Sequence, residues 1–124
     1  MTITDNQPRK YNLEERTALL GENILKFIKT IRVNDQNKPI IVQLIRSCTS
    51  VGANYMEATM AESKKDFIHK IGIVCKEVKE TKHWLRMLVI INSEIKDKAR
   101  EFWCEAHELT LIFSKSIKTA KTNK

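Results

Sequence analysis

Apolar residues recur at alternating spacings of four and three along four segments of the chain. This step keeps side chains on one side of an α-helix, whereas a strand needs alternation with a period of two. The four stripes are Leu13, Thr17, Leu20, Ile24, Phe27 and Ile31; Ile41, Ile45, Cys48, Gly52, Tyr55 and Thr59; Phe67, Ile71, Val74, Val78, Thr81, Leu85 and Leu88; and Ile95, Ala99, Phe102, Ala106, Leu109 and Phe113. Because four such helices can bury their stripes only against one another, the pattern predicts an all-α four-helix bundle.

Polar residues suited to helix starts separate the four segments, since their side-chain oxygens can accept the unpaired N–H groups of a first turn. These breaks are Asn12 with Glu15, the polar loop 34–39 that ends in Pro39, Ser63 with Asp66, and Asn92–Glu94. Helices of about 20, 23, 28 and 26 residues joined by short turns predict an up-down-up-down antiparallel bundle over residues 12–120. We expect a disordered N-terminal tail at residues 1–11 and a basic C-terminal tail at residues 121–124.

The second and third expected helices also carry apolar residues outside their stripes. These are Ile40, Val42, Leu44, Val51, Ala53 and Met56 in the second helix, and Ile73, Met87, Val89 and Ile90 in the third. A helix that faces one core is polar on its far side, so a second apolar face predicts a homo-oligomer. Gly52, next to Ala53, would let another helix approach closely. The alternative is a broad core contact with a few exposed apolar residues.

The composition fits a single helical domain with an uneven charge. The chain has 124 residues, of which 42% are hydrophobic, and only three Gly and two Pro, too few for many short strands. Residues 1–62 carry 8 Lys and Arg against 7 Asp and Glu, whereas residues 63–124 carry 14 against 8. The basic second half favours polyanionic partners such as RNA, DNA or an acidic protein surface, and a lysine-rich solvated surface is the alternative.

Cysteine usage and hydropathy indicate a cytoplasmic protein. The three cysteines are an odd number without a Cys-x-x-Cys pair, so a disulfide framework is not expected. Residues 1–10 contain no apolar run of the kind a signal peptide needs. An apolar stretch such as Leu88–Ile91 is far shorter than the ~20 residues of a membrane span.

The candidates for catalytic or metal chemistry are weak. Glu80 and His83 match the Glu-x-x-His spacing of di-metal carboxylate bundles, but His83 points away from the stripe of its helix. Cys104 and His107 could bind one zinc ion, yet no second close pair completes a tetrahedral set. There is also no nucleophile motif and no Gly-rich phosphate loop. We therefore predict no catalytic, cofactor or metal residues, and an enzyme or metal protein is the weakest hypothesis.

Two sets of polar residues are more informative. The first set is expected where the second and third helices meet, as contacts that fix helix register or join subunits. It consists of Arg46, Asn54, Glu57, Glu77 and Glu80, to which the apolar positions Val51, Gly52 and Ile73 are added as oligomer contacts. The second set is a group of cations expected to bind nucleic-acid phosphates. It consists of Lys64, Lys65, Lys76, Lys79, Lys82, Arg86, Lys115, Lys118 and Lys121.

The chain resembles a known family in three blocks: residues 46–58 (RSCTSVGANYMEA), 61–68 (AESKKDFI) and 76–81 (KEVKET), the last followed by Trp84 and Leu85. It is similar to the four-helix-bundle proteins encoded within intervening sequences of bacterial 23S ribosomal RNA genes, over about residues 11–120. The resemblance implies a small bacterial cytoplasmic protein that assembles as a ring of five subunits, with no catalytic residues. Related proteins include the accessory protein of diversity-generating retroelements, a basic pentamer that binds nucleic acid and a reverse transcriptase. Asn54 and Glu57 match the family pattern, whereas Cys48 stands where a plain small residue is more usual.

Two functions therefore remain in competition. The first is a non-enzymatic homopentamer that binds RNA or DNA with little sequence preference, as a ribosome- or retroelement-associated accessory protein, with a reverse transcriptase or another protein as a possible partner. The second is a protein–protein adaptor or scaffold without a nucleic-acid role, whose positive charge is incidental. Neither function involves a membrane.

Overall fold

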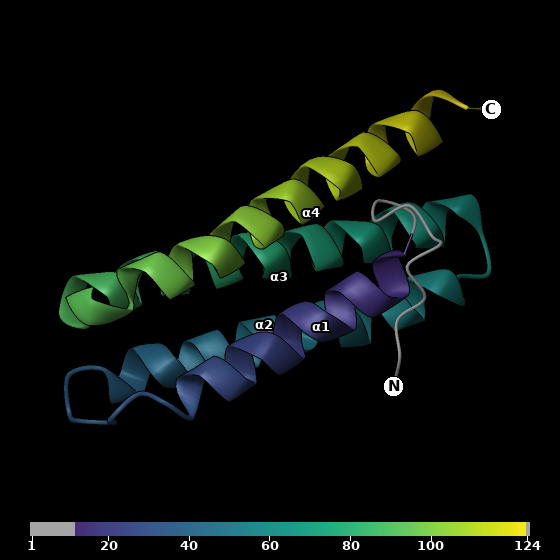
Figure 1. Ribbon diagram of the computed structural model, residues 1–124. Helices are drawn as coiled ribbons and strands as arrows, with labels where there is room; N and C mark the ends of the chain where they lie inside the picture. Colours follow the sequence, from purple (N-terminus) through teal and green to yellow (C-terminus); the bar gives the residue numbers. More distant parts are fainter. Residues whose placement is uncertain (1–11, 124) are drawn as a thin grey trace.

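The computed structural model describes residues 12–123, which form four α-helices and no strand. The helices are α1 (Leu13–Ile28), α2 (Lys38–Thr59), α3 (Lys64–Ile91) and α4 (Lys96–Thr122), with a short 3-10 turn, η2 (Ser93–Ile95), before α4. Successive helices run antiparallel (Figure 1). The all-α up-down-up-down bundle is thus confirmed. The N-terminal tail expected at residues 1–11 lies outside the described residues, and α4 continues through Thr122, into the segment expected as a C-terminal tail.

The core consists of apolar side chains from all four helices. Its fully buried members include Leu20, Ile24, Leu44, Val51, Ile71, Val74, Val78, Leu85, Leu88, Leu109 and Phe113. Burying a side chain of this size stabilises the fold by about 1.5–3 kcal/mol. The stripes expected for α1, α3 and α4 all contribute buried residues, so their periodicity located the core-facing side of these helices correctly.

The stripe expected for α2 was partly wrong. Ile45 is 37% exposed and Thr59 is exposed, whereas Leu44, Val51 and Ala58 are buried. The helix packs against both α1 and α3, so its buried arc is wide and is centred on Leu44 and Val51. Because α2 is apolar around most of its circumference, its spacing alone did not define which side faces the core. Val51 therefore packs inside its own subunit, and its expected role as a contact between subunits is wrong.

Glycine allows α1 and α2 to pack closely. A Cβ added at Gly21 would lie 2.9 Å from the backbone oxygen of Cys48, and one added at Gly52 would lie 3.5 Å from Cα of Ala18. Ordinary contacts between carbon and oxygen begin near 3.3 Å. Gly52 therefore does allow a close helix approach, but the approaching helix is α1 of the same chain.

The helix starts differ in how well the sequence predicted them. Ser63 caps α3 as expected, since its Oγ accepts a hydrogen bond from the backbone N of Asp66 at 3.0 Å. Asn12 makes no such cap, and Asn92–Glu94 leads into η2 and does not cap α4 directly.

A buried asparagine in the loop between α1 and α2 has a role that the sequence did not indicate. The Oδ1 atom of Asn37 accepts a hydrogen bond from the backbone N of Asn34 at 2.8 Å. Its Nδ2 atom donates to the carbonyl of Arg32 and to Oδ1 of Asn92, both at 3.0 Å. Asn37 thereby ties the α1–α2 loop to the turn between α3 and α4.

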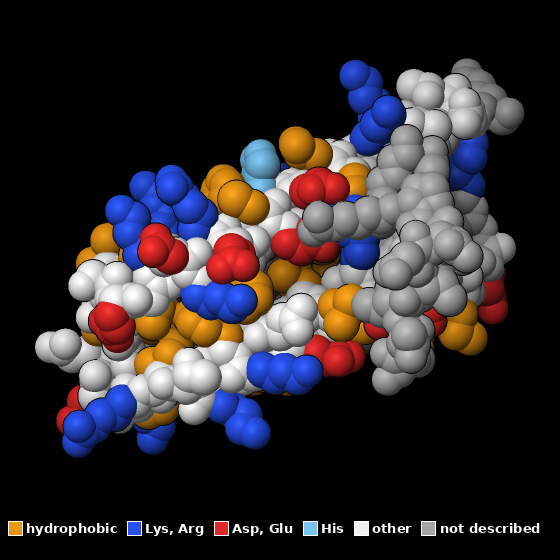
Figure 2. All heavy atoms as spheres, viewed as in Figure 1, with side chains coloured by type: hydrophobic (Ala, Val, Ile, Leu, Met, Phe, Trp, Pro, Cys, Tyr) orange, Lys and Arg blue, Asp and Glu red, His pale blue; other side chains and the backbone are white. Residues whose placement is uncertain are grey.

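The pairing of α1 with α4 is the least extensive contact between neighbouring helices. In Figure 1, α4 diverges from α1 toward its C-terminal end, and Figure 2 shows hydrophobic side chains along the seam between them. A buried arginine bridges this seam: Arg16 Nη2 lies 2.8 Å from Glu105 Oε1 and 3.0 Å from Glu108 Oε1. As a whole, α4 therefore packs mainly on α3.

Candidate nucleic-acid interface

The outward side of α3 carries cations and no acid. Its exposed positions at helical spacing include Lys65, Lys76, Lys79 and Arg86, with His69 and His83 between them. Steps of three, four and seven residues place these side chains along one face of the helix. Among residues 12–123, none of the four cations forms an ion pair. We call this set the α3 basic face.

The acidic residues of α3 are engaged elsewhere, which explains why this face keeps its positive charge. Arg46 of α2 places Nη1 3.3 Å from Glu77 Oε1 and Nη2 2.7 Å from Glu80 Oε1. Asp66 pairs with Lys70 at 3.2 Å. A buried carboxylate such as Glu77 is stabilised by the opposite charge beside it. The glutamates interleaved in sequence with the α3 lysines therefore lie against Arg46, which balances one of their two negative charges.

The other residues expected to fix the register of α2 and α3 do not join Arg46, Glu77 and Glu80. Asn54 Nδ2 donates to the carbonyl of Ser50 at 2.8 Å within α2. Glu57 is exposed and forms no ion pair with the residues that the structure describes. Ile73 is half-buried on α3. The spacing of Arg46, Glu77 and Glu80 across two antiparallel helices thus brought together three of the five polar residues.

The lysines of the C-terminal half of α4 extend the basic face. Lys115, Lys118 and Lys121 are all exposed. A groove of about 400 Å³ between α3 and α4 is lined by Gly72, Cys75, Lys76, Lys79, Ser114 and Ile117. A neighbouring hollow is lined by Ser114, Lys115, Lys118, Thr119 and Thr122. The two hollows share Ser114, so the cations of α3 and α4 border one continuous surface.

Lys82 departs from the predicted set. Its Nζ lies 3.1 Å from Nδ1 of His107 and 5.1 Å from the ring centroid of Trp103. The side chain is half-buried against α4 and is directed away from the α3 basic face. Lys64 is exposed at the first turn of α3, where the face begins. We therefore keep all the predicted cations except Lys82 as the candidate phosphate-binding set.

The residues considered for metal or nucleophilic chemistry are dispersed. Glu80 is held by Arg46, while His83 is exposed with its ring edge-on to Trp84 at 4.8 Å. Within residues 12–123, no three His, Cys, Asp or Glu side chains are grouped closely enough to hold a metal ion. Burial raises the pKa of the Cys48 thiol to about 12, which keeps it protonated at neutral pH.

Sequence reasoning missed charged residues that line a second groove between α3 and α4. This groove has a volume of about 710 Å³ and includes Lys96 and Arg100 at its rim. Their spacing of four residues on the exposed side of α4 was the signal that could have found them.

A search of the described helices for a membrane span, which needs a long apolar window with few charges, found no candidate.

The fold and this surface define a small all-α bundle with a basic side formed by its last two helices. The family described as 23S rRNA-intervening sequence protein matches residues 9–115, and the chain belongs to this family. The resemblance seen in the sequence is thus confirmed.

A solved structure supports the same assignment. The chain is similar to a protein of unknown function from the S23 ribosomal protein family of Bacteroides thetaiotaomicron VPI-5482, whose crystal structure was determined at 1.70 Å resolution. The two share 30% sequence identity with a TM-score of 0.77, over 86% of this chain and 98% of that chain. A comparison with curated proteins found no match.

Proposed function

We propose that this protein is a non-enzymatic, cytoplasmic homo-oligomer that binds the backbone of RNA or DNA through the α3 basic face and the α4 lysines. The observation that carries the proposal is the one-sided charge of α3: the four cations of its basic face form no ion pair among residues 12–123, while the acids of α3 pair with Arg46 and Lys70. The family resemblance supports a ring of five subunits and an accessory role, with a reverse transcriptase or another protein as a further partner.

The geometry favours many weak contacts over a single tight site. From Lys65 to Arg86 the face extends about 32 Å along the helix axis, at 1.5 Å per residue. One strand of B-DNA places about nine phosphates along that length, at 3.4 Å each. Four cations cover fewer than half of them, so one subunit alone binds weakly. Repetition of the face around an oligomer raises the avidity without new contacts.

The expected specificity is low. Phosphate contacts position a nucleic acid but do not identify its bases. The exposed residues along the α3 basic face include no aromatic side chain other than the two histidines, so stacking on bases is limited. Binding should therefore depend strongly on salt and little on sequence.

The test measures the anisotropy of labelled single-stranded RNA and DNA of unrelated sequences between about 50 and 200 mM salt. Each phosphate contact contributes about −0.7 to the log–log slope, so removing one phosphate contact at about 0.1 M salt weakens binding about fivefold. Lys76→Glu with Lys79→Glu should weaken binding to all sequences by at least this factor per position and flatten the slope.

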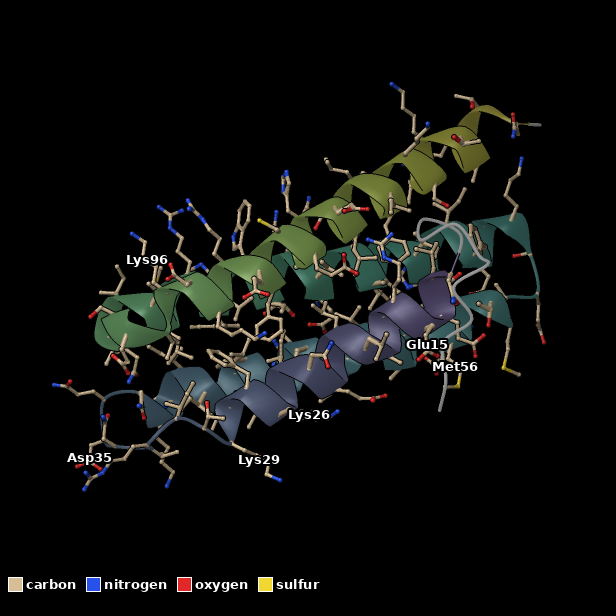
Figure 3. All side chains as sticks on the ribbon, viewed as in Figure 1. Glu15, Lys26, Lys29, Asp35, Met56 and Lys96 are labelled. Atoms are coloured by element: carbon tan, nitrogen blue, oxygen red, sulfur yellow. The ribbon has the colours of Figure 1, made fainter. Side chains whose placement is uncertain are left out.

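A matched control makes the same charge change elsewhere. Lys29→Glu with Lys38→Glu alters exposed lysines at the end of α1 and the start of α2, which belong to neither the α3 basic face nor the α4 lysines; Lys29 is labelled in Figure 3. This variant should bind like the wild type. Equal weakening by both pairs would mean that net charge alone matters, and absence of wild-type binding at about 50 mM salt would leave the adaptor function as the better explanation.

A further inference from the structure

Two apolar grooves of opposite charge lie on different helix pairs. The first, which we call the acidic groove, has a volume of about 560 Å³ and lies between α1 and α2. Of the described residues, the charged ones that line it are Glu14, Glu15 and Glu22, with no Lys or Arg among them. Ala53 and Met56 contribute apolar surface, and Met56 is 56% exposed.

The second groove, which we call the cationic groove, is the one of about 710 Å³ between the end of α3 and the start of α4. Among the residues that the structure describes, Lys96, Arg100 and Arg86 line it and no Asp or Glu does. Arg86 is also the last residue of the α3 basic face, so this contact would withdraw it from the phosphate-binding set and leave Lys65, Lys76 and Lys79 on that face. Its apolar part includes Trp103 and Ile90, and Ile90 is 78% exposed. Figure 2 shows Lys and Arg side chains gathered over the N-terminal half of α4, next to hydrophobic ones.

Neither charge set is neutralised by an ion pair within the part of the chain that the structure describes. Among residues 12–123, the three glutamates of the acidic groove and the three cations of the cationic groove form no ion pair. Exposed apolar patches rimmed by polar residues are typical of protein–protein contacts. Opposite potentials on two such patches favour their association and fix the orientation of the partners.

We propose that the cationic groove of one copy of this chain packs against the acidic groove of a second copy. The proposal deepens the homo-oligomer of the proposed function and rests on it. Figure 3 shows Glu15 and Met56 on the lower side at one end of the bundle, and Lys96 on the upper side at the other end. Each copy therefore offers both halves of the contact on opposite sides, and the contact is head-to-tail.

A head-to-tail contact has a consequence for assembly. The contact uses two different surfaces. It therefore joins copies into a closed ring when the successive rotations bring the last copy back to the first, and into an open filament when they do not. An odd number of subunits requires contacts of this kind, because a twofold contact pairs copies two by two. The ring of five that the resemblance implies is compatible with this geometry.

Charge reversal in each groove tests the contact by light-scattering mass after size exclusion. One variant carries Glu15→Lys and Glu22→Lys, and the other carries Lys96→Glu and Arg100→Glu. Each places like charges across the contact, so each alone should elute as a monomer of 14.4 kDa with unchanged helicity by circular dichroism. In an equal mixture, contacts between unlike variants pair opposite charges, so the mixture should form species heavier than the monomer, although a ring with an odd number of copies would keep one like-charge contact. One chain carrying all four changes has complementary grooves again and should recover the wild-type mass.

Lys76→Glu with Lys79→Glu is the matched control, because it should keep the wild-type mass while nucleic-acid binding falls. A wild type that is oligomeric and keeps its mass in both groove variants would overturn the head-to-tail contact and leave the oligomer intact. A mixture that stays monomeric, or a four-change chain that fails to recover the wild-type mass, would also overturn the contact. A wild type that is monomeric at all concentrations would overturn both the contact and the homo-oligomer. If Lys96→Glu with Arg100→Glu weakened RNA binding at constant mass, the groove would belong to the nucleic-acid surface instead.

Discussion

Replacing Gly21 by Ala tests the close packing of α1 on α2. The added Cβ would lie 2.9 Å from the backbone oxygen of Cys48, about half an ångström inside an ordinary carbon–oxygen contact. The contacting atom belongs to the backbone, so one helix must move as a body. Overpacking of this kind costs about 1–3 kcal/mol, against which the higher helix propensity of Ala contributes about 1 kcal/mol. The net expectation is a decrease of up to about 2 kcal/mol in the free energy of unfolding.

Gly72→Ala is the matched comparison. A Cβ at Gly72 meets no atom within 4 Å, so only the helix propensity changes, and the variant should gain about 1 kcal/mol. The difference between the two variants therefore isolates the overpacking cost of about 1–3 kcal/mol. Urea denaturation followed by far-UV circular dichroism measures it, at one fixed protein concentration because association shifts apparent stability. If the two variants were stabilised equally, α1 and α2 would not be as close as described.

Two further predictions concern buried residues of α2. Val51→Asp should lower the free energy of unfolding by several kcal/mol, because the carboxylate would enter the core of the subunit. The cooperative thermal transition should be lost as a result. A variant that is a helical, stable monomer would contradict the burial of Val51. In the Glu15→Lys, Glu22→Lys variant, which leaves the cationic groove and its lining residue Cys104 uncovered, Cys104 should react with a thiol reagent while Cys48 does not, because Cys48 is buried with a pKa of about 12 and the thiolate is scarce at any lower pH. Cys48 should become reactive in denaturant, and equal native rates for the two thiols would refute its burial.

The helices were predictable because each carries an apolar stripe long enough to outweigh local exceptions. The side of α2 that faces the core was not predictable. Leu44 and Ile45 are equally apolar, and only contact with both α1 and α3 decides which of them is buried. Asn37 gave no signal either, because its partner Asn92 is 55 positions away in the sequence.

The candidate surface was predictable in its residues but not in its net charge. The lysines of α3 are visible in the sequence, but the sequence does not show that Arg46 lies beside Glu77 and Glu80 and offsets one of their two negative charges. The departure of Lys82 depends on His107 and Trp103 of another helix. The two charged grooves could not be inferred, because each is assembled from segments of two helices.

The hydrogen bond between Asn37 and Asn92 makes the two ends of the bundle unequal in local stability. It joins two chain reversals at one end, so opening there must separate both loops together. At the opposite end, α4 diverges from α1 (Figure 1), and α4 as a whole contacts α3 far more extensively than α1. Amide hydrogens should therefore exchange fastest along residues 114–122 and slowest near Leu85 and Leu88, since local opening follows the density of buried contacts. The α4 lysines would thus lie on the segment that most readily adjusts its position to an irregular polyanion.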